Sequence, residues 1–188
     1  MICRTSWNSP KTLHSMRAGI ALGSNLGDRL AHLNEAHRLL QDLHNGSGPF
    51  LSSKIYESTP VDCPQNSPLF LNAAIELSTD LPPLDLLAKL QAIETQSGRP
   101  LTRGFHEPRT LDLDLLYLGN LRMSHNLLTL PHPRISERLF VLKPLNDICP
   151  NRQIACSERL VRNARDVLEL SPDSDCAVNF VSYFQQAT

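Results

Sequence analysis

The chain has 188 residues, 41% of them hydrophobic, which is enough to bury one sizeable core and too little for two full domains. Its 18 lysines and arginines oppose 19 aspartates and glutamates, so the formal net charge of -1 provides no overall attraction to nucleic acid or to an anionic membrane. We therefore expect small-molecule partners, neither nucleic acid nor membrane, and any cationic site should be local.

Residues 1–16 are expected to be a flexible leader, and residues 17–188 one domain whose motifs fall within 17–150. The leader has basic residues, serines and threonines but no acid, a composition shared by disordered segments and organelle transit peptides. We favour a disordered leader. No run approaches the about 20 apolar residues of a spanning helix, and the five scattered cysteines fit a reducing compartment. We expect a cytoplasmic monomer.

The first half of the chain predicts a strand, a helix and a second strand. The apolar run Ala18–Leu22 is typical of a buried strand, and Gly23–Asp28 provides a tight turn and a helix cap. Apolar residues then recur every three to four positions across Leu30–Leu43, which predicts a helix. Phe50–Glu57 contains β-favouring residues, and the proline-rich segment Thr59–Pro68 predicts a stiff loop.

The middle of the chain predicts a third strand and a second helix. Leu69–Leu77 alternates with period two, so one side faces the core while Phe70 and Asn72 share the other side. A helix begins at Pro82 and ends at Gly98, where a long loop with three arginines starts.

The fourth strand is predicted over Thr110–Leu118, with a hairpin turn at Gly119-Asn120 leading into Leu121–Met123. A short helix and the apolar run Leu139–Leu142 follow, and the tail beyond Cys149 suggests two short helices. The order β-α-β-β-α-β predicts a ferredoxin-like α+β fold, a mostly antiparallel sheet with two helices on one face.

Asp112 and Asp114 are two residues apart on this strand, so both carboxylates leave one face about 6.5 to 7 Å apart. Leu111, Leu113 and Leu115 fix the opposite face in the core. Two like charges so close favour a bound cation, and hard oxygen ligands favour Mg²⁺, which completes its shell with water and substrate phosphates. The alternative is an exposed polar face on an edge strand.

Positive charges surround this pair in the sequence. Arg99, Arg103 and Arg109 lie on the loop that leads into the strand, while His132, Arg134 and Arg138 form a second cluster. Arginines beside a metal suit phosphate and can absorb charge that develops in phosphoryl transfer. Each of these residues alone is more often surface charge.

Phe70 and Asn72 add a flat ring and a bidentate amide, which suit a heteroaromatic ligand. The alternative is a phenylalanine covered by the proline-rich loop.

Four motifs in order resemble the 6-hydroxymethyl-7,8-dihydropterin pyrophosphokinase family of folate synthesis. They are Gly23–Leu26, Phe70–Ala74, Pro108–Leu116 and Pro131–Arg134, within about residues 17–150. The resemblance implies the ferredoxin-like fold and transfer of the β,γ-pyrophosphoryl group of ATP to the pterin hydroxymethyl group, releasing AMP. It also implies two Mg²⁺ ions held by Asp112 and Asp114.

The resemblance further implies roles for individual residues. Arg99 and Arg109 would be catalytic arginines that close over the phosphates. The pterin would contact Ser58, Thr59, Pro60, Val61, Phe70, Asn72 and Phe140. ATP would contact Gln91, Glu94, Arg103, Leu115, Thr129, His132 and Arg138.

Two other classes of function are weighed. A non-catalytic pterin or nucleotide binder of the same fold is suggested by Leu101 and Glu107, which depart from the family pattern in the arginine loop. An RNA-binding ferredoxin-like module would need stacking aromatics on a basic sheet face. An aromatic content of 5% and the net charge of -1 disfavour that module.

Overall fold

The computed structural model describes residues 15–60, 67–98, 108–155, 161–163, 166 and 177–185. Its main sheet contains β1 (Met16–Ser24), β3 (Ile55–Ser58), β4 (Phe70–Thr79), β5 (Asp112–Leu118) and β10 (Val178–Ser182). They run in the order β10-β3-β4-β1-β5, every neighbouring pair antiparallel. The short strand β2 (Leu51–Ser52) also pairs with β4. This order confirms the ferredoxin-like α+β prediction.

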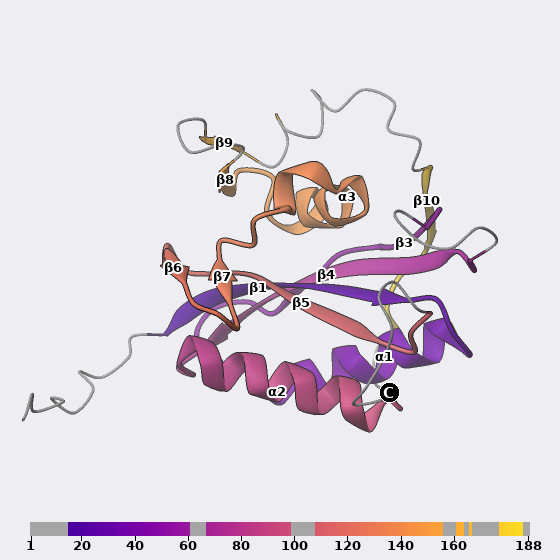
Figure 1. Ribbon diagram of the computed structural model, residues 1–188, viewed down its shortest axis with the longest axis horizontal. Helices are drawn as coiled ribbons and strands as arrows, with labels where there is room; N and C mark the ends of the chain where they lie inside the picture. Colours follow the sequence, from indigo (N-terminus) through magenta and orange to yellow (C-terminus); the bar gives the residue numbers. More distant parts are fainter. Residues whose placement is uncertain are drawn as a thin grey trace, which may run out of the picture.

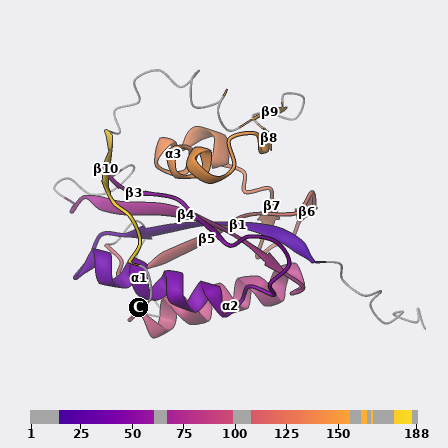
Figure 2. The same cartoon turned by 180° about the vertical axis from the view of Figure 1, so that it is seen from behind.

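Three helices sandwich the sheet. Helices α1 (Arg29–Gln41) and α2 (Pro83–Gln96) cover one face, and α3 (Leu139–Ile148) lies over the other (Figures 1 and 2). Asp28 caps α1, because its side chain accepts the N–H of Ala31 at 3.0 Å. None of the helices in the described ranges has the length and apolar content needed to cross a membrane.

Strand alternation divides the interior into two unequal parts. On the α1/α2 side, Ala18, Ile20 and Leu22 of β1 pack with leucines of both helices. On the α3 side a smaller apolar cluster includes Leu116 and Tyr117, which face the same way because the β1–β5 register shifts beside them. Because this apolar cluster is small, the end of the α3 face near Gly23 and Asp112 can accommodate polar groups.

The segments after β5 differ from the sequence prediction. The turn at Gly119 forms, with φ of 54°, but the next strand does not return along β5. Instead β6 (Met123–Ser124) pairs with β7 (Thr129–Leu130). A short 3-10 turn, Ile135–Glu137, then precedes α3, which extends well beyond the apolar run.

The tail beyond Cys149, where the pattern suggests two short helices, contributes three strands to the described structure, and Asp166 between them is helical. β8 (Gln153–Ala155) pairs with β9 (Val161–Asn163), and β10 adds to the edge of the main sheet beside β3. The β-branched and aromatic residues of β10 suit a strand, and the backbone edge of β3 supplies its partners.

Candidate active site

A row of three residues crosses the sheet on the α3 side. Asp112 of β5 lies opposite Gly23 of β1, and Gly23 lies opposite Asn72 of β4. A Cβ on Gly23 would be 3.7 Å from Asn72 Oδ1, 3.8 Å from Phe70 Cδ1 and 3.9 Å from Asp112 Cβ. The missing side chain of Gly23 therefore opens a shared floor between the Phe70/Asn72 pair and the carboxylates.

The two aspartates of β5 are each held by an arginine. Arg109 Nη1 lies 2.6 Å from Asp112 Oδ2, and Arg138 Nη1 lies 3.2 Å from Asp114 Oδ2. Burial, reinforced by the charge of Asp112, raises the pKa of the Asp114 carboxyl, while His132, Arg138 and Arg109 oppose the shift. The pair is thus under electrostatic stress that added positive charge would relieve.

The second cationic cluster comes to the same end of the sheet. The main-chain N–H of His132 donates to Leu116 O at 2.7 Å, which places the imidazole beside Asp114. Its Nδ1 accepts the N–H of Arg134 at 3.2 Å, so the neutral ring carries its proton on Nε2. Burial lowers the pKa of His132, which favours this neutral form.

Arg109 is positioned by a residue that the sequence analysis does not single out. Asn25, only 2% exposed, accepts the N–H of Arg109 on Oδ1 at 2.7 Å and donates its own N–H to Arg109 O at 3.1 Å. Its Nδ2 also donates to Pro68 O at 3.4 Å. Asn25 therefore joins the turn after β1 to the segments that lead into β4 and β5. Its place in the Gly23–Leu26 motif was the only signal in the sequence.

The side chain of Arg109 has capacity left for a ligand. Its Nε is buried and has no hydrogen-bond partner in the described structure, although Nη1 is paired with Asp112. A buried guanidinium N–H without a partner is costly. A phosphate oxygen is the kind of acceptor that would satisfy it.

Among the predicted pterin residues, Ser58 lies on β3, Phe70 and Asn72 on β4 and Phe140 on α3, while Thr59 and Pro60 follow β3 directly. Asn72 Nδ2 donates to Ser58 Oγ at 2.8 Å, and both residues are buried. Phe70 and Phe140 are half-buried, and the Arg138 guanidinium carbon lies 5.7 Å from the Phe140 ring centroid. Arg138 thus connects Phe140 with Asp114.

Part of the predicted ATP set lies at the outer edge of β5. Glu94 of α2 is buried, and its Oε1 accepts the Leu113 N–H at 2.8 Å. That N–H points away from β1, so the main chain of Leu115, two residues on, also faces the outer edge. The Leu115 side chain is buried in the α1/α2 core, while Gln91 of α2 and Thr129 of β7 are exposed.

The structure does not bring this edge group onto the carboxylate face. Three of the predicted residues, Val61, Arg99 and Arg103, lie outside the described residues, as do Leu101 and Glu107.

The carboxylate pair suits magnesium in its donor set. Among the described residues no group of three or more His, Cys, Asp or Glu side chains could enclose a metal ion. Mg²⁺ commonly takes only one or two carboxylates, with phosphate and water oxygens completing the shell. Asp112 and Asp114 on one face fit that pattern.

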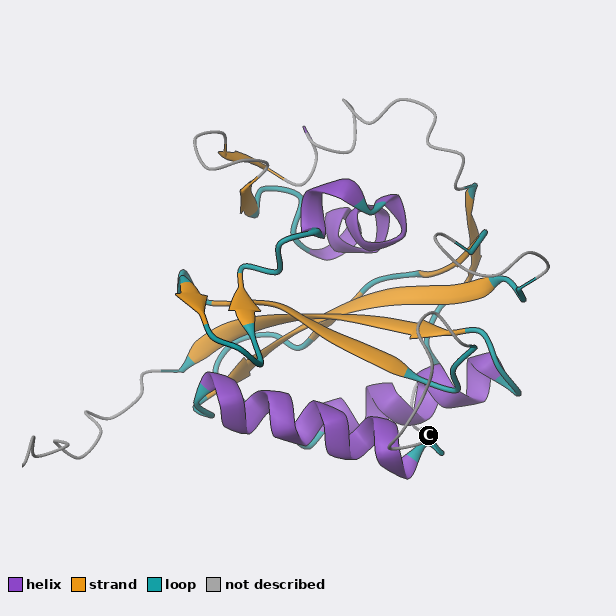
Figure 3. Cartoon of the chain, in the orientation of Figure 1, coloured by secondary structure: helices purple, strands orange, loops and turns teal. Residues whose placement is uncertain are grey.

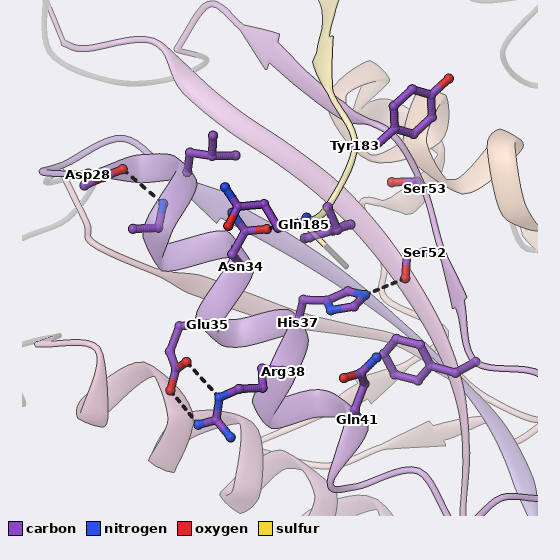
Figure 4. Close-up of a pocket in the computed structure, with 14 residues that line it drawn as sticks. Asp28, Asn34, Glu35, His37, Arg38, Gln41, Ser52, Ser53, Tyr183 and Gln185 are labelled. Atoms are coloured by element: carbon purple, nitrogen blue, oxygen red, sulfur yellow. Dashed lines mark hydrogen bonds and ion pairs between the residues drawn. The ribbon is translucent and has the colours of Figure 1, made fainter. Parts of the chain in front are cut away.

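A cavity of about 900 Å³ lies elsewhere, between α1, the β2 region and the C-terminal segment 183–185 (Figure 4). Two pairs of its polar side chains already contact each other: Glu35 with Arg38 at 2.7 Å, and His37 Nε2 with Ser52 Oγ at 2.8 Å. None of the predicted site residues lines it.

Fold and site together define a ferredoxin-like domain with a carboxylate pair and arginines on one sheet face, the groups that phosphoryl-transfer enzymes use. The chain belongs to the 7,8-dihydro-6-hydroxymethylpterin-pyrophosphokinase (HPPK) family, whose model matches residues 19–150. This confirms the family resemblance and, with it, the expected class of function.

Two relatives are named 2-amino-4-hydroxy-6-hydroxymethyldihydropteridine pyrophosphokinase. The Bacillus subtilis protein is 45% identical over 133 residues, 70% of this chain and 77% of its own. The Haemophilus influenzae protein is 39% identical over 162 residues, 82% of this chain and 98% of its own.

A similar fold occurs in a crystal structure of HPPK-DHPS in complex with substrates, with a TM-score of 0.65 and 16% identity. The match covers 82% of this chain but only 43% of that one. This chain therefore spans less than half of that two-part protein.

Proposed function

We propose that this protein transfers the β,γ-pyrophosphoryl group of ATP to the hydroxymethyl oxygen of 6-hydroxymethyl-7,8-dihydropterin. The new bond joins that oxygen to the β-phosphorus, the bond from the β-phosphorus to the oxygen of the α-phosphate breaks, and AMP leaves while the hydroxyl proton is lost. The observation that carries the proposal is the family match over residues 19–150, within which Asp112 and Asp114 share one face with Asn72.

Asp112 and Asp114 are the residues that would hold Mg²⁺, two ions in this proposal. When bound, the ions would neutralise the triphosphate and orient it. The chain itself contributes Arg109, whose unpartnered Nε can donate to a phosphate oxygen. Together with Arg99 it would stabilise the charge that moves onto AMP.

The ATP site would extend from this face to the outer edge of β5. His132 offers an Nε2–H donor and Arg138 a guanidinium for the phosphates. The main chain at Leu115, which faces the outer edge of β5, suits the hydrogen-bonding edge of a purine. Glu94 fixes that edge through Leu113. The remaining proposed ATP residues are Gln91, Arg103 and Thr129.

The pterin would lie beside Gly23, with its ring against Phe70 and Phe140. One N–H of Asn72 Nδ2 donates to Ser58, while Oδ1 faces the Gly23 floor, where it would accept a ring N–H. Main-chain groups of Ser58, Thr59, Pro60 and Val61 would complete the contacts. This arrangement would bring the hydroxymethyl group toward the carboxylate end of the floor.

The deciding experiment incubates the protein with Mg²⁺, ATP and the reduced pterin and separates AMP from ADP by chromatography. We expect AMP that depends on pterin. Tight pterin binding without AMP would select the non-catalytic alternative, and salt-dependent RNA binding would select the nucleic-acid module. We also propose a cytoplasmic monomer of one domain, which light scattering of the purified chain would test for its oligomeric state.

A further inference from the structure

Strand β10 lies outside the part of the chain that matches the family, yet it borders the proposed pterin site. The family match ends at residue 150, whereas β10 begins at Val178. Val178 pairs with Ser58 and Phe180 pairs with Tyr56, so β10 extends the sheet beyond β3 (Figures 1 and 2).

The start of β10 is hydrogen-bonded to one side of that site, the segment Ser58–Pro60. Thr59 donates its N–H to Ala177 O at 3.3 Å, immediately after the pairing of Ser58 with Val178. Ser58 in turn accepts the amide of Asn72. The segment Ala177–Val178 therefore fixes the backbone from which the proposed pterin contacts of β3 begin.

The segment Ala177–Val178 also contacts the opposite side of the site, which Phe140 of α3 provides. The Val178 side chain, 7% exposed, forms a small buried cluster with Tyr56, and Leu139 and Phe140 pack against this cluster. Lys143 of α3, one turn after Phe140, donates its Nζ to Val178 O at 2.5 Å. Helix α3 and the proposed ring-stacking residue are thus tied to β10 by packing and by a hydrogen bond.

We propose that Val178 is a positioning residue for pterin binding, which fixes Phe140 relative to the segment Ser58–Pro60. This inference rests on the proposed function. Val178 acts through Phe140, because Phe140 packs against the cluster that Val178 forms with Tyr56, and stacking depends on the spacing and angle of the rings. A looser Phe140 would weaken pterin binding more than nucleotide binding, because it would reach the proposed phosphate groups indirectly, through Arg138.

The test compares two identical substitutions in one strand. Val178→Ala removes two methyl groups from the cluster that Phe140 packs against, whereas Val181→Ala changes a residue that is 45% exposed and outside the cluster. We expect Val178→Ala to raise the pterin KM and Kd about fivefold, a size typical of two lost methyl contacts. The ATP KM of Val178→Ala should stay within about twofold of the parental value. Val181→Ala should resemble the parent in both KM values. Val178→Ile, which keeps a β-branched side chain in the cluster, should have a pterin KM near the parental one.

Lys143→Met gives an independent measurement, because it removes the donor to Val178 O and keeps an unbranched side chain over Tyr56. It should also raise the pterin KM selectively, and it carries the test if Val178→Ala does not fold. Equal changes in the ATP and pterin KM, or no change in either variant, would overturn the positioning role.

Phe140→Ala separates this inference from the proposed function. If Phe140→Ala weakens pterin binding while the Val178 and Lys143 variants do not, only the positioning role fails. If Phe140→Ala leaves pterin binding unchanged, the proposed pterin site itself is wrong.

Discussion

Gly19 and Gly23 occupy the same face of β1, and the space over each determines what a methyl group would do there. Over Gly23 a Cβ meets only ordinary contacts with Phe70, Asn72 and Asp112. We expect Gly23→Ala to fold with nearly parental stability and to lose affinity for pterin, because the methyl group narrows the floor of the site. Calorimetric titration with the pterin and a thermal melt would measure both effects.

Gly19→Ala is the matched control, since its Cβ would overlap the ring of Tyr117. That ring cannot easily move, because its hydroxyl donates to Glu76 at 2.8 Å and the Arg152 guanidinium lies 3.9 Å from its centroid. Overpacking should cost about 1–3 kcal/mol in the free energy of unfolding. If Gly23→Ala were the less stable of the two variants, the assignment of open space over Gly23 would be wrong.

Asp114 provides a prediction in which stability and activity move in opposite directions. Its pKa is raised by burial and by Asp112, so the folded protein holds the proton more tightly than the unfolded chain. That contribution is full below the ordinary carboxyl pKa and is lost as the pH rises through the raised value. In metal-free buffer, Asp114→Asn should therefore melt at or above the parental temperature at neutral pH, and the gap should close in acid.

The same Asp114→Asn variant should lose Mg²⁺-dependent turnover, because one of the two proposed ligands is gone. Asp80→Asn, at an exposed carboxylate just after β4, is the control and should leave both melting temperature and turnover unchanged. If Asp114→Asn melts well below the parent at neutral pH, the ion pair of Asp114 with Arg138 stabilises the fold by more than the burial of the charged carboxylate destabilises it.

At the scale of elements, Asn25 couples three segments that are distant in sequence. Asn25→Ala leaves the Arg109 N–H without its acceptor, a loss of about 1–3 kcal/mol for a buried group. We expect kcat to fall by tenfold or more while the pterin KM changes less, because Arg109 would no longer be held beside the phosphates. Asn25→Asp keeps the acceptor for Arg109 and should recover part of kcat; equal loss in both variants would refute this account.

Local patterns in the sequence predict much of this architecture and fail where partners are remote. Period two placed Phe70 and Asn72 on one face of β4 and the two aspartates on one face of β5, since alternation is a property of each strand alone. The Asn25 contacts could not be predicted this way, because they join residues far apart in the chain.

The edges of the sheet show the same limit. The pairing of β6 with β7 in place of β5, and of β10 with β3, depends on which strand edges the folded core leaves available. The composition of β10 favours an extended chain but does not determine which strand it pairs with. The roles proposed for Arg99, Arg103 and Val61 stay predictions, because those residues lie outside the described structure.

Over the molecule as a whole, one face of the sheet supplies most of the apolar core and the other face carries the candidate active site. Helices α1 and α2 lie on one face of the sheet and α3 on the other (Figure 3). The face under α1 and α2 is closely packed with leucine and isoleucine, while the face beneath α3 combines a small apolar cluster with the polar row. Helix α3 covers only part of that second face, and the described aspartates lie at its uncovered end with 22% and 36% side-chain exposure. Ligand binding should therefore add stability to a face that has little apolar packing of its own.

Thermal melts with ligands test this division. We expect a non-hydrolysable ATP analogue to raise the melting temperature with Mg²⁺ and to have little effect with EDTA, because the phosphates and the two carboxylates repel each other without the metal. At about 100 times Kd the gain corresponds to roughly 2.7 kcal/mol. Asp112→Asn should reduce this shift while leaving the stabilisation by pterin alone intact, since the pterin contacts lie across Gly23. An undiminished nucleotide shift in EDTA would mean that the arginines alone bind the triphosphate and that the carboxylate pair is not the metal site.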